Sequence, residues 1–136
     1  MPLRSILLVD DDPDVRRLAA LSLERIGGFR VTLATSAREA LEQVGRFLPD
    51  LILLDVSMPE MDGPATFAAL RLIPSMHEVP IVFLTAGASD TEVARLRALG
   101  AIAVIPKPFE LRELPVRIRD IAASAGLDLG NDGRAG

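Results

Sequence analysis

Cysteine, tyrosine and tryptophan are absent from this sequence of 136 residues. The absence of Cys excludes a disulfide, a thiolate metal site and a Cys nucleophile. No apolar run approaches the ~18 residues that a membrane span needs, and the amino terminus lacks the pattern of a signal peptide. We therefore expect a soluble, cytoplasmic protein that makes no contact with a membrane.

Lysine is nearly absent as well. Of the 15 basic residues only Lys107 is a Lys, and all the others are Arg. The compact ammonium group of Lys is not interchangeable with a guanidinium group, so Lys107 is a candidate site residue. The net charge of −4 argues against a surface that binds nucleic acid directly. Hydrophobic residues make up 49% of the chain, which is enough to bury the core of one domain.

Short apolar runs alternate with helical patterns along the chain. The runs predict strands over residues 3–9, 29–34, 51–54, 80–84 and 101–105. Each strand is followed by a segment in which apolar residues recur at helical spacing. This alternation predicts an α/β fold, namely a single doubly wound parallel sheet of five strands with five helices on its two faces.

Several residues mark the ends and faces of the expected helices. Asp12 is a candidate N-cap of the first helix. The apolar spacing puts Ile26 and Leu99 on the inward faces of the first and fourth helices. Pro115 conflicts with a last helix that starts near Glu110, so we expect a late start or a slight kink there.

The carboxyl-terminal residues differ in composition from the rest of the chain. Residues 126–136 hold four of the ten Gly residues and few large apolar side chains. Such a composition is typical of a flexible segment. We expect residues 1–124 to form the domain and residues 125–136 to be a flexible tail or the remnant of a linker.

Chemically distinctive residues stand where four of the expected strands end. Asp10 and Asp11 follow the first strand, Asp55 the third, Thr85 the fourth and Lys107 the fifth. Parallel strands end at one edge of the sheet, where open α/β folds bind their ligands. Carboxylates with no His or Cys beside them favour Mg²⁺ or Mn²⁺. With a hydroxyl and an ammonium group added, such carboxylates form a phosphoryl-transfer site, in which one carboxylate attacks phosphorus.

Four motifs occupy these positions, and their order along the chain is specific. They are Val9-Asp10-Asp11-Asp12, residues 54–63, Leu84-Thr85-Ala86 and Lys107-Pro108-Phe109. Together they resemble the receiver domain of response regulators in two-component signalling. The resemblance covers about residues 4–123. It implies a flavodoxin-like receiver fold with the strand order 2-1-3-4-5, which follows from the family and not from the residue patterns.

The resemblance also implies a role for each acidic residue. Asp55 matches the phosphoacceptor. Asp11 matches a direct ligand of Mg²⁺ (or Mn²⁺), and Asp10 matches a ligand that acts largely through water. The backbone carbonyl of Ser57 matches a further metal ligand, beside Asp55 itself. Asp12 is an alternative to Asp10 in this pair, but the spacing from Asp11 to Arg16 favours Asp10.

The remaining site residues match positions that sense the phosphoryl group. Thr85 matches the switch hydroxyl, and Ala86 the small residue that leaves room for it. Lys107 matches the lysine that contacts the phosphoryl group, and its bond to Pro108 is typically cis in the family. Val104 is a departure, because an aromatic residue of the switch commonly stands at this position. The aromatic half of the usual switch is therefore missing.

The implied function is that of a signalling switch. A phosphohistidine of a histidine kinase or of a histidine phosphotransfer protein would donate a phosphoryl group to Asp55. The face formed by the fourth helix, the fifth strand and the fifth helix would then change its preference for a downstream protein or for a second copy of the chain, as a phosphorylation-dependent homodimer.

Other functions are open on the sequence alone. The chain could be a receiver excised from a larger regulator or a hybrid histidine kinase, or a receiver-like module that binds partners without phosphorylation. An aspartyl-phosphate hydrolase of the haloacid dehalogenase type is disfavoured. That chemistry normally uses a second Asp two residues after the nucleophile, where this chain has Ser57.

Overall fold

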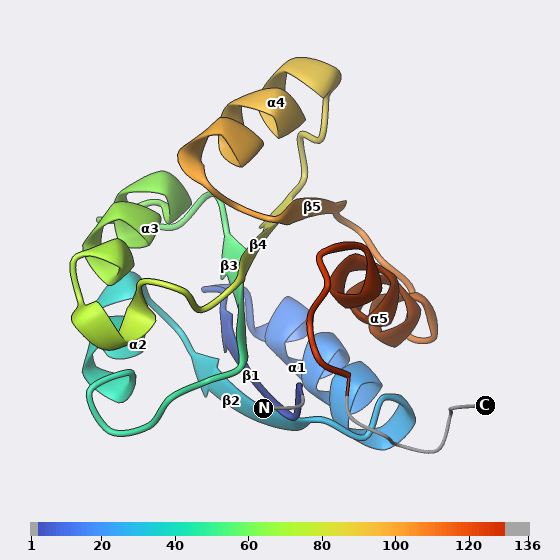
Figure 1. Ribbon diagram of the computed structural model, residues 1–136. Helices are drawn as coiled ribbons and strands as arrows, with labels where there is room; N and C mark the ends of the chain where they lie inside the picture. Colours follow the sequence, from blue (N-terminus) through green and yellow to red (C-terminus); the bar gives the residue numbers. More distant parts are fainter. Residues whose placement is uncertain (1–2, 130–136) are drawn as a thin grey trace.

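Five parallel strands form the centre of the protein, in a computed structural model that describes residues 3–129 (Figure 1). The strands are β1 (Ser5–Val9), β2 (Arg30–Ala34), β3 (Leu51–Asp55), β4 (Ile81–Thr85) and β5 (Ala103–Pro106). Their order is β2-β1-β3-β4-β5, and every neighbouring pair is parallel. The predicted fold class and strand order are confirmed. The fifth strand is shorter than expected, since it begins at Ala103 and not at residue 101.

Helices cover both faces of the sheet (Figure 1). The α-helices are α1 (Pro13–Leu21), α2 (Ala37–Gln43), α3 (Gly63–Arg71), α4 (Asp90–Leu99) and α5 (Glu113–Ser124). The π-helix η1 (Ser22–Ile26) continues α1, and the 3-10 helix η2 (Pro74–Met76) follows α3. Asp12, Ser36, Asp62 and Ser89 cap α1 to α4, each accepting a hydrogen bond from a backbone amide of the first turn. The sequence therefore encodes the starts of these helices locally.

The core consists of two layers, one on each face of the sheet. Successive strand residues point to opposite faces, so Leu7 and Val9 of β1 join one layer while Ile6 and Leu8 join the other. The first layer contains residues of α2, α3 and α4, and the second contains residues of α1, η1 and α5. All five residues of β3 are buried, as expected for a central strand of a doubly wound sheet.

Two residues predicted on inward helix faces are exposed instead. Ile26 is 42% exposed because η1 has the wider π-helical turn, which shifts its last residue out of the α-helical stripe. Leu99 is 45% exposed at the last position of α4, where Gly100 ends the helix. Pro115 is accommodated by a late start: α5 begins at Glu113, so Pro115 lies in the first turn.

The described chain continues past α5 as an ordered segment. Leu127 and Leu129 pack against the layer that contains α1 and α5. The amide of Leu3 donates a hydrogen bond to the carbonyl oxygen of Asp128 (2.8 Å). The predicted flexible tail, residues 125–136, stays a prediction, and residues 130–136 lie outside the described part. Among residues 3–129, no helix combines the length and the apolar character that crossing a membrane requires.

Candidate functional site

The strand pairing brings the predicted site residues to neighbouring positions. β1 pairs with β3 so that Val9 lies beside Leu54, which places Asp10 next to Asp55. β3 pairs with β4 so that Asp55 lies beside Leu84, immediately before Thr85. Thr85 in turn pairs with Pro106, immediately before Lys107. We call this end of the sheet the carboxyl edge. The four predicted strand ends therefore meet at one place.

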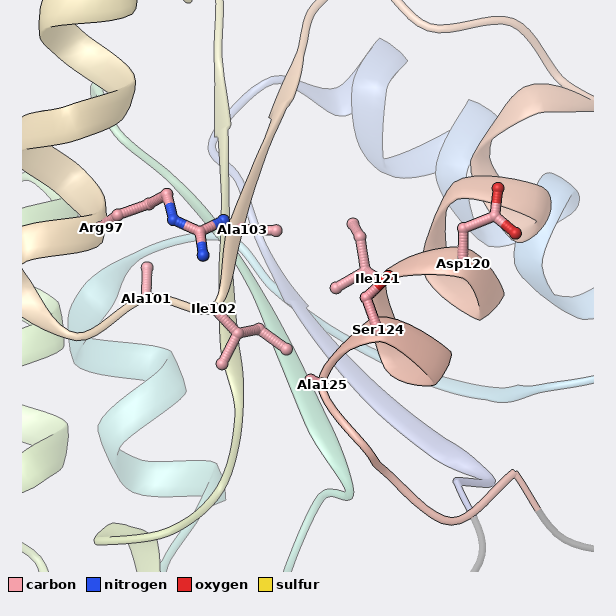
Figure 2. A pocket seen from close by; sticks show the side chains of 8 residues that line it. All are labelled: Arg97, Ala101, Ile102, Ala103, Asp120, Ile121, Ser124 and Ala125. Carbon is pink, nitrogen blue, oxygen red and sulfur yellow. The ribbon is translucent and has the colours of Figure 1, made fainter.

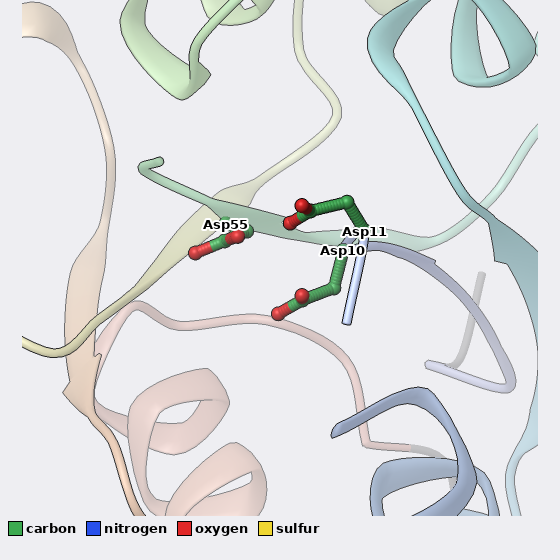
Figure 3. Close-up of side chains that lie close together, drawn as sticks. All are labelled: Asp10, Asp11 and Asp55. Atoms are coloured by element: carbon green, nitrogen blue, oxygen red, sulfur yellow. The ribbon is translucent and has the colours of Figure 1, made fainter. Parts of the chain in front are cut away.

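Three carboxylates form a cluster at the carboxyl edge (Figure 3). Carboxylate oxygens of Asp10, Asp11 and Asp55 all lie within 4.8 Å of one another. Asp10 is fully buried and Asp55 is 4% exposed, whereas Asp11 is open to solvent. Buried carboxylates at this separation repel one another strongly, so the cluster favours a cation among them. The donor set consists of hard oxygen ligands, which fits Mg²⁺ or Mn²⁺.

Lys107 supplies one compensating charge. Its ammonium nitrogen lies 2.9 Å from Oδ2 of Asp10 and 3.0 Å from Oδ1 of Asp55. Burial by itself lowers the pKa of Lys107, but the hydrogen bonds and charges of the two carboxylates outweigh it and raise that pKa above its ordinary value. The only Lys of the chain is thus held in its charged form between the two buried carboxylates.

Asp55 is only partly compensated. Its burial raises the pKa of the carboxyl group from 3.8 to about 6. The hydrogen bond from Lys107 lowers this pKa, the charge of Asp10 raises it, and the charge of Lys107 and the amide of Ser57 lower it. Desolvation and a like charge therefore prevail over one shared ammonium group. A further positive charge at this site would favour the ionised form, which is the nucleophilic form.

Backbone contacts hold the acidic cluster in place. Oδ1 of Asp10 accepts a hydrogen bond from the amide of Asp12 (2.9 Å), and Arg16 donates to the carbonyl oxygen of Asp10 (3.0 Å). These contacts favour Asp10 as the buried member of the pair and leave Asp12 to cap α1. Sequence reasoning noticed Arg16 only by its spacing, and its contact with Asp10 is a tertiary feature.

Gly63 packs directly against the backbone of Asp55, a role that the sequence analysis did not predict. A Cβ atom at this position would lie 2.4 Å from the carbonyl oxygen of Asp55 and 2.8 Å from Cα of Val56. No side chain fits at such distances, so only Gly lets the start of α3 approach β3 this closely. The preceding residue, Asp62, has a local role instead, as the N-cap of α3.

A cavity of about 410 Å³ opens above the cluster. It is lined by Asp10, Asp11, Asp12, Pro13, Asp55, Val56, Ser57, Thr85, Ala86 and Lys107. Ser57 and Ala86 lie at its exposed rim, and Thr85 is buried. Val104 lines no part of this cavity and packs beside the layer formed with α2, α3 and α4. The Lys107–Pro108 peptide bond is cis, as the resemblance implies.

Residues 6–119 match the response regulator receiver domain family. The chain belongs to this family. The predicted resemblance is confirmed, and with it the assignment to two-component signalling. The cluster of Asp10, Asp11 and Asp55 is the acidic triad typical of a receiver Mg²⁺ site.

Two relatives illustrate the match. Response regulator Rre1 of Synechocystis sp. (strain ATCC 27184 / PCC 6803 / Kazusa) is 36% identical over 130 residues, which cover 94% of this chain and 56% of Rre1. Transcriptional regulatory protein CpxR of Escherichia coli (strain K12) is 41% identical over 119 residues, which cover 88% of this chain and 49% of CpxR. The chain thus spans about half the length of these relatives.

A solved structure shares the fold almost throughout. The chemotaxis response regulator CheY4 of Vibrio cholerae superimposes with a TM-score of 0.81 at 29% identity. The superposition covers 88% of this chain and 98% of the CheY4 chain. Nearly the whole CheY4 chain therefore has the same fold as the matched part of this chain.

Proposed function

We propose that this receiver accepts a phosphoryl group on Asp55 from a phosphohistidine and converts it into a change of partner. The observation that supports this most directly is the buried Asp55 carboxylate, flanked by Asp10 and Asp11 and contacted by Lys107 at 3.0 Å. The donor would belong to a histidine kinase or a histidine phosphotransfer protein, and the same donor implies a cytoplasmic location. The family is a signalling phosphoacceptor, and no catalytic family is indicated.

The transfer follows from the residues around the cavity. An ionised oxygen of Asp55 attacks phosphorus, the bond from phosphorus to the imidazole nitrogen breaks, and the imidazole takes up a proton as it leaves. Lys107 moves its ammonium group from the two carboxylates towards the equatorial oxygens that carry the charge. A Mg²⁺ (or Mn²⁺) ion held by the carboxylates would supply further positive charge at this site. Asp55 then carries an acyl phosphate.

Four groups of this chain would hold the Mg²⁺ (or Mn²⁺) ion. Asp11 and Asp55 contribute carboxylate oxygens, and Ser57 contributes its backbone carbonyl oxygen. Asp10 acts largely through water, because Oδ1 already accepts from the amide of Asp12 and Oδ2 from Lys107. Ser57 lies on the exposed rim of the cavity, which agrees with this role.

Thr85 would detect the phosphoryl group. In the unphosphorylated protein its Oγ1 accepts a hydrogen bond from the amide of Gly87 (3.0 Å), so the hydroxyl is tied to its own loop. A phosphoryl oxygen offers the hydroxyl a charge-assisted hydrogen bond, which contributes roughly 1.5–3 kcal/mol. Ala86 leaves room for this movement. Val104 is small and stiff, so the loop after Thr85 has to make the adjustment that a ring would otherwise make.

The surface of α4, β5 and α5 is the proposed output face. Figure 2 shows a hollow there between α4 and α5, with Arg97 on one side, Asp120 on the other and Ile102 and Ile121 between them. Its volume is about 520 Å³. An apolar floor flanked by opposite charges suits a protein partner. That partner is a downstream protein or a second copy of this chain, and the acidic chain is not expected to bind nucleic acid directly.

Intact mass spectrometry tests the proposal. The protein is incubated with acetyl phosphate and Mg²⁺, and we expect a gain of one phosphoryl group in the natural sequence and none in Asp55→Asn. Asp50→Asn is the matched control, because Asp50 precedes the same strand at the opposite end of the sheet, and it should be phosphorylated normally. A natural chain that takes up no phosphoryl group would instead support the alternative of a phosphorylation-independent binding module. Uptake by Asp55→Asn would refute the assignment of Asp55.

The difference in length between this chain and its relatives supports a second alternative, in which the receiver is part of a longer protein. The chain spans about half of CpxR and Rre1, so a receiver taken from a larger regulator or from a hybrid kinase has the same site. The mass experiment applies equally to both.

A further inference from the structure

Ser22 is a fully buried hydroxyl that the proposed function does not use. It is the first residue of η1, and it is 0% exposed. Its Oγ donates a hydrogen bond to the backbone carbonyl oxygen of Leu111. Leu111 belongs to the segment between β5 and α5, the same segment that begins with Lys107. The hydroxyl therefore connects the α1–η1 helix to the loop that carries the only Lys of the chain.

Pro115 removes one possible donor to the Leu111 carbonyl. Leu111 lies immediately before Arg112, the N-cap of α5, and an α-helical donor to its carbonyl oxygen would be the amide four residues later. Residue 115 is a proline and has no N–H group, so Leu111 cannot obtain a helical hydrogen bond from it. Leu111 is partly buried, and a carbonyl group shielded from water without a donor is costly. Ser22 supplies from another helix the donor that Pro115 lacks.

Two contacts therefore join the same two parts of the chain. The ammonium group of Lys107 contacts Asp10 at 2.9 Å, and the hydroxyl of Ser22 contacts Leu111. Asp10 and Ser22 stand at either end of α1, while Lys107 and Leu111 stand at either end of the loop. The contacts close a ring through α1, η1 and the loop. Figure 1 shows the same proximity, with α5 beside the helix that starts at α1.

The other attachments of the loop do not join its far end to α1 or η1. Local hydrogen bonds hold that end to the start of α5, since the amide of Glu110 donates to a carboxylate oxygen of Glu113 and the amide of Glu113 donates to the carbonyl oxygen of Glu110 (both 3.0 Å). The amide of Lys107 donates to the carbonyl oxygen of Thr85 (2.8 Å), which fixes the backbone where β5 ends. The ring of Phe109 is buried in the layer that contains α1 and α5. None of these contacts connects the carbonyl group of Leu111 to η1. The hydrogen bond from Ser22 makes this connection, and through it η1 holds the loop that carries Lys107.

We propose that Ser22 is a positioning residue for Lys107: its hydrogen bond to Leu111 holds the loop so that the ammonium group reaches Asp10 and Asp55. The consequence for phosphorylation rests on the proposed function, but the placement of Lys107 does not. Ser22 touches none of the carboxylates and acts only through the loop. Its loss would loosen Lys107 while the acidic cluster stays assembled.

The single lysine makes a direct experiment available. Lysine labelled with ¹³C at Cε gives one side-chain signal from the metal-free, unphosphorylated full chain, and this signal belongs to Lys107. At one fixed pH, we expect Ser22→Ala to move this signal towards that of free lysine and to broaden it. We also expect phosphorylation by acetyl phosphate to slow by about threefold to tenfold, the range of one hydrogen bond.

Ser5→Ala is the matched control. Ser5 also makes a long-range hydroxyl hydrogen bond, to Asp50 (3.2 Å), but at the opposite end of the sheet. Both variants should lower the midpoint of urea unfolding, and only Ser22→Ala should move the Lys107 signal. Should Ser22→Ala fail to fold, Ser22→Cys keeps the size and a weak donor, and it should shift the same signal by a smaller amount.

The outcomes separate the two proposals. A Lys107 signal in the Ser22 variants that coincides with that of the natural chain would overturn the positioning role, and so would an equal shift in Ser5→Ala. A natural chain that takes up no phosphoryl group would overturn the proposed function instead, while the lysine signal would still decide the role of Ser22.

Discussion

Asp50 and Asp55 stand at opposite ends of the third strand, and their surroundings differ completely. Asp50 accepts hydrogen bonds from the amides of Arg4 and Ser5 (both 2.9 Å) and from the hydroxyl of Ser5 (3.2 Å). Asp55 shares one ammonium group with Asp10 and has a pKa of about 6. The satisfied carboxylate ties two strands together, whereas the poorly compensated one is available for chemistry. The same residue type thus stabilises one edge of the sheet and strains the other.

The largest effect on stability should come from removing the Asp50 carboxylate, whose hydrogen bonds are satisfied. Asp50→Ala removes the acceptor of three donors, two of them backbone amides, and we expect it to lower the free energy of unfolding by about 3 kcal/mol. Urea unfolding measures this change. The rate of phosphorylation below the unfolding transition should stay within about twofold of the natural rate, because local rearrangements of an edge seldom cross the sheet. A large loss of rate in folded Asp50→Ala would show that the two edges are coupled.

Replacing Asp55 should instead raise the free energy of unfolding at neutral pH. Its folded pKa lies near 6, above the ordinary value of 3.8, so the folded state binds more protons than the unfolded state in this window. Stability contributed by this group is therefore present at low pH and lost as the pH rises from about 4 to about 6. Asp55→Asn removes this dependence. Relative to the natural chain, the metal-free variant should gain about 2–3 kcal/mol between pH 4 and pH 7.

Urea unfolding at a series of pH values, at constant ionic strength, measures this difference. The natural chain serves as the reference at each pH, so that the titration of other carboxylates cancels. A difference between the two proteins that stays constant from pH 4 to pH 7 would contradict the strained state of Asp55.

Lys107→Arg should have an intermediate effect on function and little on the fold. The guanidinium group is larger and planar, and it cannot occupy the point between Asp10 and Asp55 as a compact charge can. We expect phosphorylation to slow by about tenfold, which corresponds to about 1.4 kcal/mol. Arg46→Lys, an exposed change away from the cavity, is the control. If Lys107→Arg is phosphorylated and binds its partner like the natural chain, a compact ammonium group is not required at this position.

The smallest signals should come from the switch. On binding beryllofluoride, a mimic of phosphorylated Asp55, Thr85 exchanges its contact with Gly87 for one to the bound group. Amide chemical shifts should then change mainly over residues 85–92, because a Cβ atom at Gly87 would meet no other atom within 4 Å and the backbone there is free to adjust. The methyl signals of Val104 should move little. Large shifts of the Val104 methyl signals without shifts over residues 86–92 would show that β5, and not the loop after Thr85, changes conformation.

Much of the carboxyl edge was predictable because strand ends are local features. A run of apolar residues that stops at a carboxylate identifies Asp55, and parallel strands must end together. The candidate N-cap Asp12 likewise identified the start of the first helix. Inward faces were less predictable: the π-helical turn of η1 turned Ile26 outwards, and no local pattern indicates such a turn.

The sequence by itself determined the fold class, the strand ends and the residue types at the site, because periodicity, caps and turn residues act over a few positions of the chain. Only the tertiary structure decided the rest. Lys107 contacts Asp10 across 97 positions, and Ser22 contacts Leu111 across 89. The close approach of Gly63 to the Asp55 backbone also depends on tertiary packing. Each of these contacts depends on how helices pack on the sheet, and packing distances are not written in any short segment of the chain.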